Sequence, residues 1–299
     1  MASPQDISIR QLQYVVAVAD TLGFHRAAES CHVSQPTLST QIAQVEAVLG
    51  VTLFERDKRR VLVTDVGREV VERARAVLVA VGDLLATAER ARDPFAATLR
   101  IGVIPTVAPY LLPEITPELT RRFPRLQLVF REEKTDEIVA HLDTGELDGG
   151  LLAFEAELGD LARAEVTMDP FVVALPRHHA LAKRKTVKLG DIADEPVLLL
   201  DEGHCLREHA LSLCHKVGAR ETDLRATSLA TLVQMVSAGV GVTLLPALAV
   251  DVENRRAQLD IKPLAAPVPK RTIGFVWRKS APNAKVFAAL ADAAKAALR

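Results

Sequence analysis

The chain has 299 residues, of which 49% are hydrophobic and 25% are charged, and its net charge is −1. A chain of this length can hold two or three domains, and the near-neutral total gives no sign of nucleic-acid binding, although it can conceal a local basic patch. Aromatic residues make up only 4% of the chain, which argues against single-strand binding by base stacking. Because we find no secretory signal and no membrane-spanning apolar run, we expect a cytoplasmic protein without membrane contact.

The N-terminal region shows the spacing of three short helices. Ile9–Leu22 and Phe24–Cys31 carry apolar positions at helical intervals. Ser34 is a good N-cap for a third helix that ends at Gly50. A tight turn between the second and third helices predicts a helix-turn-helix. Short polar side chains near the start of the third helix suit base edges and phosphates: Gln35, Thr37, Ser39 and Thr40.

Two short strand-like runs, Leu53–Arg56 and Val61–Thr64, follow the third helix. They enclose a basic turn, which predicts the wing of a winged helix. Its side chains would contact DNA phosphates and give salt-dependent affinity: Arg56, Lys58, Arg59 and Arg60. A solvated charged turn on an ordinary three-helix core explains the same spacing equally well.

A long helix is predicted from Asp65 to Arg90, because this stretch keeps a heptad spacing and contains no proline. Its apolar positions alternate steps of four and three: Val70, Ala74, Val77, Val81, Leu84 and Ala88. We call this row the seam. A seam this narrow predicts a partner helix, and homodimerisation would bring two DNA-binding heads to two half-sites. Asp93-Pro94 then marks a hinge.

Beyond Ala97 strands and helices alternate, which predicts an α/β architecture with largely parallel sheets. The predicted strands lie near 99–104, 126–130, 149–153, 171–175, 197–200, 242–245 and 271–276. The predicted helices lie near 110–123, 136–144, 206–217, 229–238 and 283–298. A break near Asp169-Pro170 suggests two lobes, with the last strand and helix returning to the first.

These patterns divide the chain into four parts. We expect a winged helix-turn-helix over 1–64, a linker and dimerisation helix over 65–92, a hinge over 93–97 and a regulatory domain over 98–299. Within the regulatory domain, lobe I comprises 98–168 with 270–299, and lobe II comprises 169–269.

Polar residues occupy four strand-to-helix junctions of the regulatory domain: Thr106, Thr135, His204 and Ser228. In open α/β sheets, ligands sit at the carboxyl ends of strands, where helix N-termini direct N–H groups into a crevice. One such residue alone is better explained as a helix cap. Four together predict a ligand-binding cleft.

Two of the three cysteines, Cys205 and Cys214, lie nine positions apart in a segment with helical spacing. Nine helical steps place them about 13 Å apart along the axis and on opposite faces, whereas a disulfide needs Cα atoms within roughly 7 Å. In a reducing compartment such a pair is more often reactive or metal-binding than a structural staple. A bridge between them would require the helix to unwind. Cys31 is interpreted as a core residue.

Cys205 follows Gly203-His204 at the start of its predicted helix, so we expect a lowered thiol pKa, helped by Arg207 and His209 nearby in sequence. A cysteine thiolate is a nucleophile that oxidants convert to a sulfenic acid, and a second thiol can then convert the sulfenic acid to a disulfide. Imidazole and thiolate also suit zinc or copper, but His204 and His209 do not share a helical face. We therefore predict no metal and no cofactor.

Several motifs resemble the LysR-type transcriptional regulators. They are Arg10-Gln-Leu-Gln-Tyr-Val-Val-Ala-Val, Ala27-Ala28, Ser34-Gln-Pro-Thr-Leu-Ser39, Leu53-Phe-Glu-Arg56 and Thr64-Asp-Val-Gly67. In the second half, Ile104-Pro-Thr106, the stretch from Gly203 to Cys214, Arg225-Ala-Thr-Ser228 and Gly241-Val-Thr-Leu-Leu-Pro246 are similar to the hydrogen-peroxide sensors of that family.

The resemblance implies a regulator rather than an enzyme, with a two-lobed effector domain like that of periplasmic binding proteins. It implies that Cys205 is the peroxidatic thiol and Cys214 the resolving thiol of a reversible disulfide. Peroxide would be held or the thiol tuned by Thr106, Thr135, His204, Arg207 and Arg271. Further DNA contacts are implied for Arg10, Ser34 and Pro36, although the sequence Arg56-Asp-Lys-Arg-Arg60 departs from the pattern in the wing.

The partners implied are promoter DNA, hydrogen peroxide, RNA polymerase and three further copies of the chain in a dimer of dimers. Glutaredoxin or thioredoxin would reduce the disulfide. Two alternatives remain. A LysR-type regulator that answers a small-molecule effector or a metal in the cleft needs no cysteines. A two-cysteine thiol peroxidase would be an enzyme, and it would have no use for the wing, the seam and the hinge.

Overall fold

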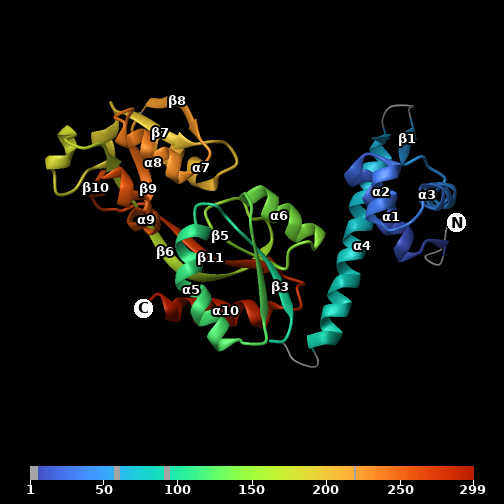
Figure 1. The fold of residues 1–299 in the computed structure, drawn as a ribbon. Coiled ribbons are helices and arrows are strands. Elements are labelled where there is room, and N and C mark those ends of the chain that lie inside the picture. The colour runs from blue at the N-terminus through green and yellow to red at the C-terminus, as the bar shows by residue number, and fades with distance from the viewer. Residues whose placement is uncertain (1–5, 57–60, 91–94, 219) are drawn as a thin grey trace. The chain divides into compact units, whose positions relative to one another are not determined.

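The computed structural model describes residues 6–56, 61–90, 95–218 and 220–299. They form two compact units, the first made of Met1–Ala88 with Asp143–Gly145 and the second of Glu89–Leu142 with Glu146–Arg299. The first unit is a helical head with a small sheet, and the second is a mixed α/β structure (Figure 1). The predicted fold class is therefore confirmed. None of the helices in the described segments is long and apolar enough to span a membrane.

The first unit has the three helices and the strand pair expected from the sequence. These elements are α1 (Ile9–Thr21), α2 (Phe24–Ser30), α3 (Gln35–Leu49), β1 (Phe54–Arg56) and β2 (Val61–Val63). The two strands pair in antiparallel fashion. Val15, Leu38, Ile42 and Leu53 are fully buried between the helices and the strand pair. The apolar positions that predicted the helices thus form the core of this unit.

Local caps set the limits of α3 and the start of α4 (Asp65–Arg90). The Ser34 hydroxyl accepts a hydrogen bond from the backbone N–H of Thr37, and Gly50 ends α3 in the left-handed conformation, with φ of +70°. The Thr64 hydroxyl accepts from the N–H of Gly67 at 2.9 Å. A Cβ atom at Gly67 would collide with the carbonyl oxygen of Leu53, which explains the glycine.

The burial of the seam residues changes along α4. Val70 packs against the three-helix core, and Ala74 is buried. Farther along the helix, the side chains of Val77 and Leu84 are 45% and 69% exposed. Val70 and Val81 are intermediate. In the second half of the seam, Val77 and Leu84 therefore present apolar side chains that the other described residues do not cover.

The central sheet of the second unit has seven strands in the order β10-β6-β11-β5-β3-β4, with β9 also paired to β6. Its strands are β3 (Thr98–Val103), β4 (Gln127–Glu132), β5 (Gly149–Ala153), β6 (Leu161–Leu175), β9 (Thr243–Pro246), β10 (Asp260–Pro263) and β11 (Lys270–Arg278). β3 runs parallel to β4 and β5, but β11 is antiparallel to β5 and β6. The expectation of largely parallel sheets is wrong in this respect, because the returning last strand runs against both of its neighbours.

The break predicted near Asp169-Pro170 does not interrupt the chain's secondary structure, because both residues lie within β6. The strand runs through these residues without interruption, and only its partners change. Its first part pairs with β11 as far as Pro170, and from Phe171 onward it pairs with β9 and β10. A single strand therefore belongs to two hydrophobic cores.

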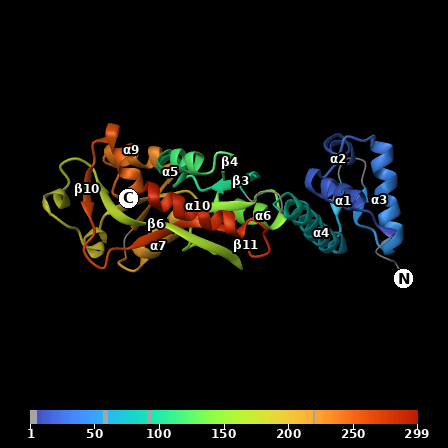
Figure 2. The same ribbon diagram turned by 90° about the horizontal axis from the view of Figure 1, so that it is seen from below.

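Each core has its own helices. The first packs α5 (Ala108–Arg122), α6 (Thr135–Thr144) and α10 (Ala284–Ala297) around β3, β5 and β11, and α10 lies along β6 and β11 (Figures 1 and 2). The second packs α7 (Cys205–His215), α8 (Leu229–Ser237) and α9 (Ala247–Ala257) around β7 (Pro196–Leu200), β8 (Arg220–Ala226) and β9. We name these the first and second cores. Three elements, α9, β8 and β10, are not predicted from the sequence.

Candidate functional site

Both cysteines of interest lie on α7, and both are free thiols. Gly203 has φ of +83°, His204 is the N-cap, and Cys205 is the first helical residue. Cys205 packs against the first core, whereas Cys214 is 2% exposed within the second core. The two ends of one helix therefore hold their thiols in different cores.

A cavity of about 300 Å³ opens at Cys205. It is lined by Thr135, Asp136, Ala156, Glu157, Gly203, Cys205 and Glu208. We call it the thiol cavity. The Thr135 hydroxyl is buried and makes no hydrogen bond of ordinary geometry. It nevertheless lies close enough to the Cys205 sulfur to favour the thiolate. An unpartnered buried hydroxyl beside a thiol is a feature that a small polar ligand could satisfy.

The pKa of Cys205 is raised, which is the reverse of the expected direction. Burial is the largest cause, since it disfavours the charged thiolate. The Thr135 hydroxyl, the charge of Arg271 and the backbone N–H of Leu206 oppose it, and the carboxylate of Glu208 adds to the increase. The helix start does help the thiolate, but desolvation outweighs it.

Arg271 on β11 is fully buried and is held by hydrogen bonds to Asp169 and Thr106. Its Nε donates to Asp169 Oδ2 at 2.9 Å, its Nη1 donates to Thr106 Oγ1 at 2.8 Å, and its Nη2 donates to the carbonyl of Thr106 at 2.8 Å. The other carboxylate oxygen of Asp169 accepts from the N–H of Leu248 at the start of α9. Asp169, which the sequence analysis did not single out, links the two cores through this network.

Arg207 and His209 are expected from the sequence to lower the pKa of the Cys205 thiol, but neither is among the groups that shift it. Arg207 Nη1 donates to Glu221 Oε1 at 2.7 Å and to the carbonyl of Leu200 at 2.9 Å. His209 packs edge-on against the ring of Phe171, and burial lowers its pKa. The positive charge that favours the Cys205 thiolate comes from Arg271 instead. The pairing of Arg207 with Glu221 could not be read from sequence, because Glu221 lies on the missed strand β8.

A second cavity, of about 320 Å³, lies beside the first. Its lining includes Thr106, Tyr110, Lys134, His204, Ser228 and Glu253. Three of the four junction residues thus meet here, and the fourth, Thr135, lines the thiol cavity. Burial and the charge of Lys134 lower the pKa of His204, which favours a neutral imidazole. Tyr110 donates to Glu253 Oε1 at 2.7 Å and joins α5 to α9.

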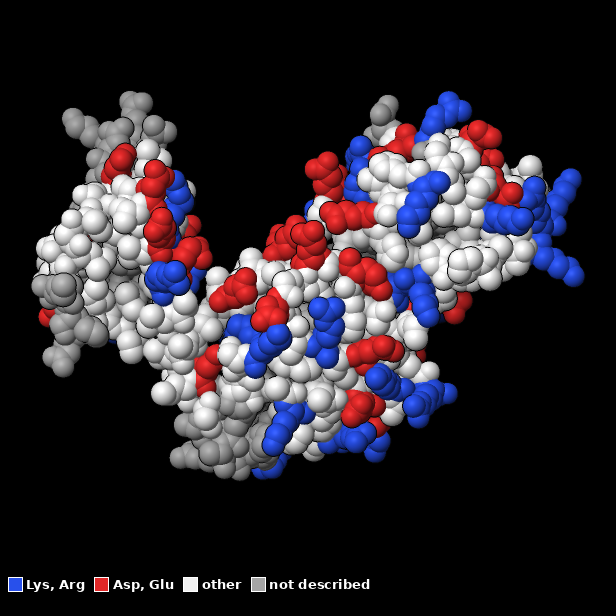
Figure 3. Space-filling model, turned by 180° about the vertical axis from the view of Figure 1, so that it is seen from behind, with Lys and Arg blue, Asp and Glu red and all other residues white. Residues whose placement is uncertain are grey.

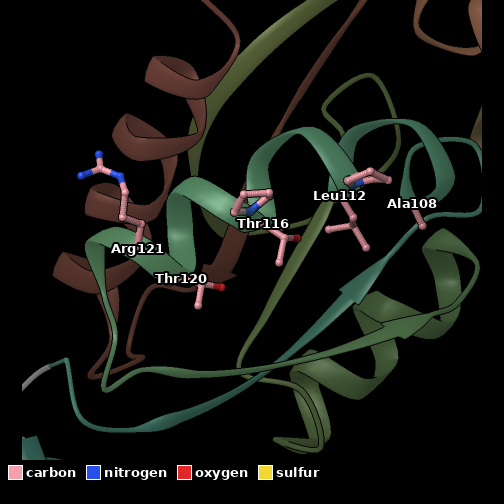
Figure 4. A pocket seen from close by; sticks show the side chains of 7 residues that line it. Ala108, Leu112, Thr116, Thr120 and Arg121 are labelled. Atoms are coloured by element: carbon pink, nitrogen blue, oxygen red, sulfur yellow. The ribbon is translucent and has the colours of Figure 1, made fainter.

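A further groove runs along α5 and is mostly apolar (Figure 4). Leu112, Thr116 and Thr120 line one stretch of it. No group of three or more His, Cys, Asp or Glu side chains suited to a metal ion is found among the described residues.

The side chains predicted to read DNA lie at the exposed start of α3. Gln35 and Thr37 are exposed, whereas the Thr40 hydroxyl donates back to the carbonyl of Pro36 at 2.9 Å. Arg10 Nε donates to the Tyr14 hydroxyl at 2.8 Å. Three predicted features lie outside the described residues: the side chain of Arg56, the basic residues 58–60, which include Arg59, and the hinge at Asp93-Pro94.

Comparisons with known proteins cover nearly the whole chain. The model named "Bacterial regulatory helix-turn-helix protein, lysR family" matches residues 9–68, and the model named "LysR substrate binding domain" matches residues 92–299. The DNA-binding transcriptional dual regulator OxyR of Escherichia coli K12 is 45% identical over 291 residues, which are 97% of this chain and 95% of the relative.

Two solved structures match nearly the whole of this chain. A full-length OxyR variant from Pseudomonas aeruginosa is 36% identical, with a TM-score of 0.77, and the match covers 97% of this chain and 95% of that one. An OxyR variant from Corynebacterium glutamicum, described as bound to hydrogen peroxide, is 31% identical, with a TM-score of 0.67 and coverage of 97% and 92%. These relatives are transcriptional regulators and not enzymes.

Proposed function

The chain belongs to the LysR family of DNA-binding transcriptional regulators, and we propose that it senses hydrogen peroxide through a reversible disulfide between Cys205 and Cys214. One observation carries this proposal. The Cys205 thiol shares a cavity with the unpartnered, buried hydroxyl of Thr135, and the second thiol, that of Cys214, lies nine residues farther along the same helix. The relatives named for peroxide support the same assignment.

The chemistry needs only peroxide and the two thiols. The Cys205 thiolate attacks one oxygen of hydrogen peroxide, the O–O bond breaks, hydroxide leaves, and a sulfenic acid remains on the sulfur. The Cys214 thiolate then attacks that sulfur, a disulfide forms, and hydroxide leaves again. Thr135 and the pair of Thr106 with Arg271 are suited to orient peroxide and to hold the thiolate, while neutral His204 lines the adjoining cavity.

The disulfide also requires a change of shape. Both thiols lie on α7, where nine helical steps keep them about 13 Å apart, so the helix must unwind before they can meet. Because the ends of α7 pack in different cores, unwinding alters both. We propose that two chains pair through the uncovered half of the seam, which brings two DNA-binding heads together. Two such dimers would bind promoter DNA as a dimer of dimers. The change of shape in α7 would alter this assembly and thereby its contact with RNA polymerase. Glutaredoxin or thioredoxin would reverse the oxidation.

The test is footprinting of the full-length protein on its own upstream DNA, before and after micromolar peroxide. The unmodified protein and a Cys31→Ser control should form an intramolecular disulfide and change the footprint. Cys205→Ser should do neither, and Cys214→Ser should stop at the sulfenic acid. A peroxide-dependent footprint that survives in Cys205→Ser would end the proposal.

A regulator that answers a small-molecule effector is the second candidate. The cavity at Lys134, His204 and Ser228 favours it, since it offers charged and polar side chains in a space of about 320 Å³. In that case the Cys205→Ser variant would keep its inducible footprint in cells. The two candidates are thus separated by the same variant.

A further inference from the structure

The mouth of the thiol cavity is acidic. Asp136 lies in the first turn of α6, Glu208 in the first turn of α7, and Glu157 in the loop after β5. All three carboxylates are exposed, and none of the described residues that line the cavity is lysine or arginine. Figure 3 shows acidic side chains gathered in the region of α6 and α7.

The neighbouring positive charges do not cancel this acidity. The charge of Arg271 favours the thiolate, but this side chain is fully buried and is paired with the buried carboxylate of Asp169. The Lys134 ammonium donates to the carbonyl of Glu202 at 2.8 Å and lies against Gly203, which lines the thiol cavity, so one positive charge opposes the three carboxylates. An approaching reagent therefore meets a negative potential before it reaches the sulfur.

The cavity also has the features of a ligand site besides its charge. Thr135 is 4% exposed and lines the cavity together with Cys205, and its hydroxyl lacks a partner of ordinary geometry. Such an arrangement suits a small molecule that can both donate and accept hydrogen bonds. Charge at the mouth then selects among the small oxidants that could fill it.

We propose that Asp136, Glu157 and Glu208 determine oxidant specificity by admitting uncharged hydroperoxides and repelling anionic oxidants. This inference rests on the proposed peroxide reaction at Cys205. The chemistry at sulfur is the same for both classes. With hydrogen peroxide, the thiolate gives a sulfenic acid and hydroxide; with peroxymonosulfate, a monoanion, it gives a sulfenic acid and sulfate. Only the second reagent carries charge past the carboxylates.

The size of the effect follows from solvent screening. Exposed charges interact weakly through water, and the Debye length is about 8 Å at physiological ionic strength. We therefore expect the carboxylates to slow an anionic oxidant by about three- to tenfold at low salt, and by less as salt is added. The rate of an uncharged oxidant should depend on the mouth charge only through the pKa of the Cys205 thiol, which Glu208 raises.

The experiment compares hydrogen peroxide with peroxymonosulfate on the full-length, reduced protein. The rate of thiol loss is followed by rapid quenching and mass analysis of the Cys205 peptide, at pH 7 and at low and high salt. The variant is Asp136→Asn with Glu157→Gln, which leaves Glu208 in place because that carboxylate also acts on the thiol. The control is Glu114→Gln with Asp292→Asn, two exposed carboxylates on α5 and α10.

We expect the variant to react about fivefold faster with peroxymonosulfate at low salt and within twofold of the unmodified protein with hydrogen peroxide. The control should change neither rate. Salt should accelerate the reaction with peroxymonosulfate more in the unmodified protein than in the variant, because the thiolate repels the anion in both proteins and only the mouth carboxylates differ.

If the ratio of the two rates at low salt is the same in the unmodified protein, the variant and the control, the specificity inference is overturned and the peroxide sensor stands. If hydrogen peroxide leaves the Cys205 thiol intact in every protein, the proposed function fails, whatever the mouth does. A single Glu157→Gln variant repeats the comparison should the double variant fold poorly.

Discussion

The guanidinium of Arg271 and the carboxylate of Asp169 meet at 2.9 Å, and neither side chain is more than 1% exposed. Removing either charge leaves the other without compensation in a region from which water is excluded. Arg271 acts on the Cys205 thiol and Asp169 binds the start of α9, so loss of the pair would disturb the packing of both cores.

Asp169→Asn should therefore lower the free energy of unfolding by about 3 to 5 kcal/mol, because a buried guanidinium loses its partner. Urea denaturation followed by circular dichroism measures this change. Asp160→Asn is the matched control, since Asp160 forms an exposed pair with Lys279, and its unfolding midpoint should not move. Equal midpoints for the two variants would contradict the role given to Asp169.

Thr135→Val should raise the pKa of the Cys205 thiol further, because the hydroxyl favours the thiolate. Only the thiolate attacks peroxide, so the rate of oxidation rises with pH up to the thiol pKa. The pH profile of the variant should shift toward higher pH and reach a lower plateau, because the hydroxyl is also proposed to orient peroxide. Thr135→Ser, which keeps the hydroxyl, should follow the unmodified protein. A lower plateau at an unchanged midpoint would mean that the hydroxyl acts on peroxide alone.

Cys214 should make the reduced protein sensitive to alkali. Burial raises the pKa of Cys214 to about 11, whereas the thiol of an unfolded chain titrates near 8.5. The stability that comes from the neutral, buried thiol is therefore complete below pH 8.5 or so and is lost as the pH rises toward 11. We expect a loss of about 3 kcal/mol over this interval.

Urea denaturation of the reduced protein at several pH values measures this loss, with Cys214→Ala as the comparison. The variant lacks the thiol, so its stability should fall less over the same interval. Parallel curves for the two proteins would show that other groups cause the alkaline loss.

At the DNA interface, Gln35→Ala should reduce the preference for the operator over other sequences, by about 1 to 3 kcal/mol, because Gln35 is exposed at the start of α3. Arg59→Ala should instead weaken binding to all sequences and reduce the salt slope by about one. Binding titrations on operator and random DNA at several salt concentrations separate the two effects. Identical behaviour of both variants would contradict the division between base and phosphate contacts.

The helices of the first unit were predictable because their signals are local. Ser34 caps α3, Gly50 ends it, and Gly67 is required by the nearby carbonyl of Leu53. The second unit depends on pairing between distant strands. No local pattern shows that β11 runs antiparallel between β5 and β6, or that the charged run of β8 is a strand.

The same limit applies to the thiol. The sequence places Cys205 at a helix start, and this is where the structure has it. It does not show that α6 and β11 enclose the sulfur, and this burial reverses the direction of the pKa shift. The pairings of Arg271 with Asp169, and of Arg207 with Glu221, likewise join residues that are far apart in the chain or lie on an unexpected strand.

The anchoring of α7 also bears on how the proposed sensor would return to its resting state. Leu206, Ala210 and Leu213 are buried along α7, and exposing one leucine costs about 1.5 to 3 kcal/mol. A disulfide that forms at the expense of this packing is less stable by the same amount. For a two-electron couple, each 1.4 kcal/mol raises the reduction potential by about 30 mV. The packing that keeps α7 helical would thus make the disulfide readily reducible, and the signal would end once peroxide is gone.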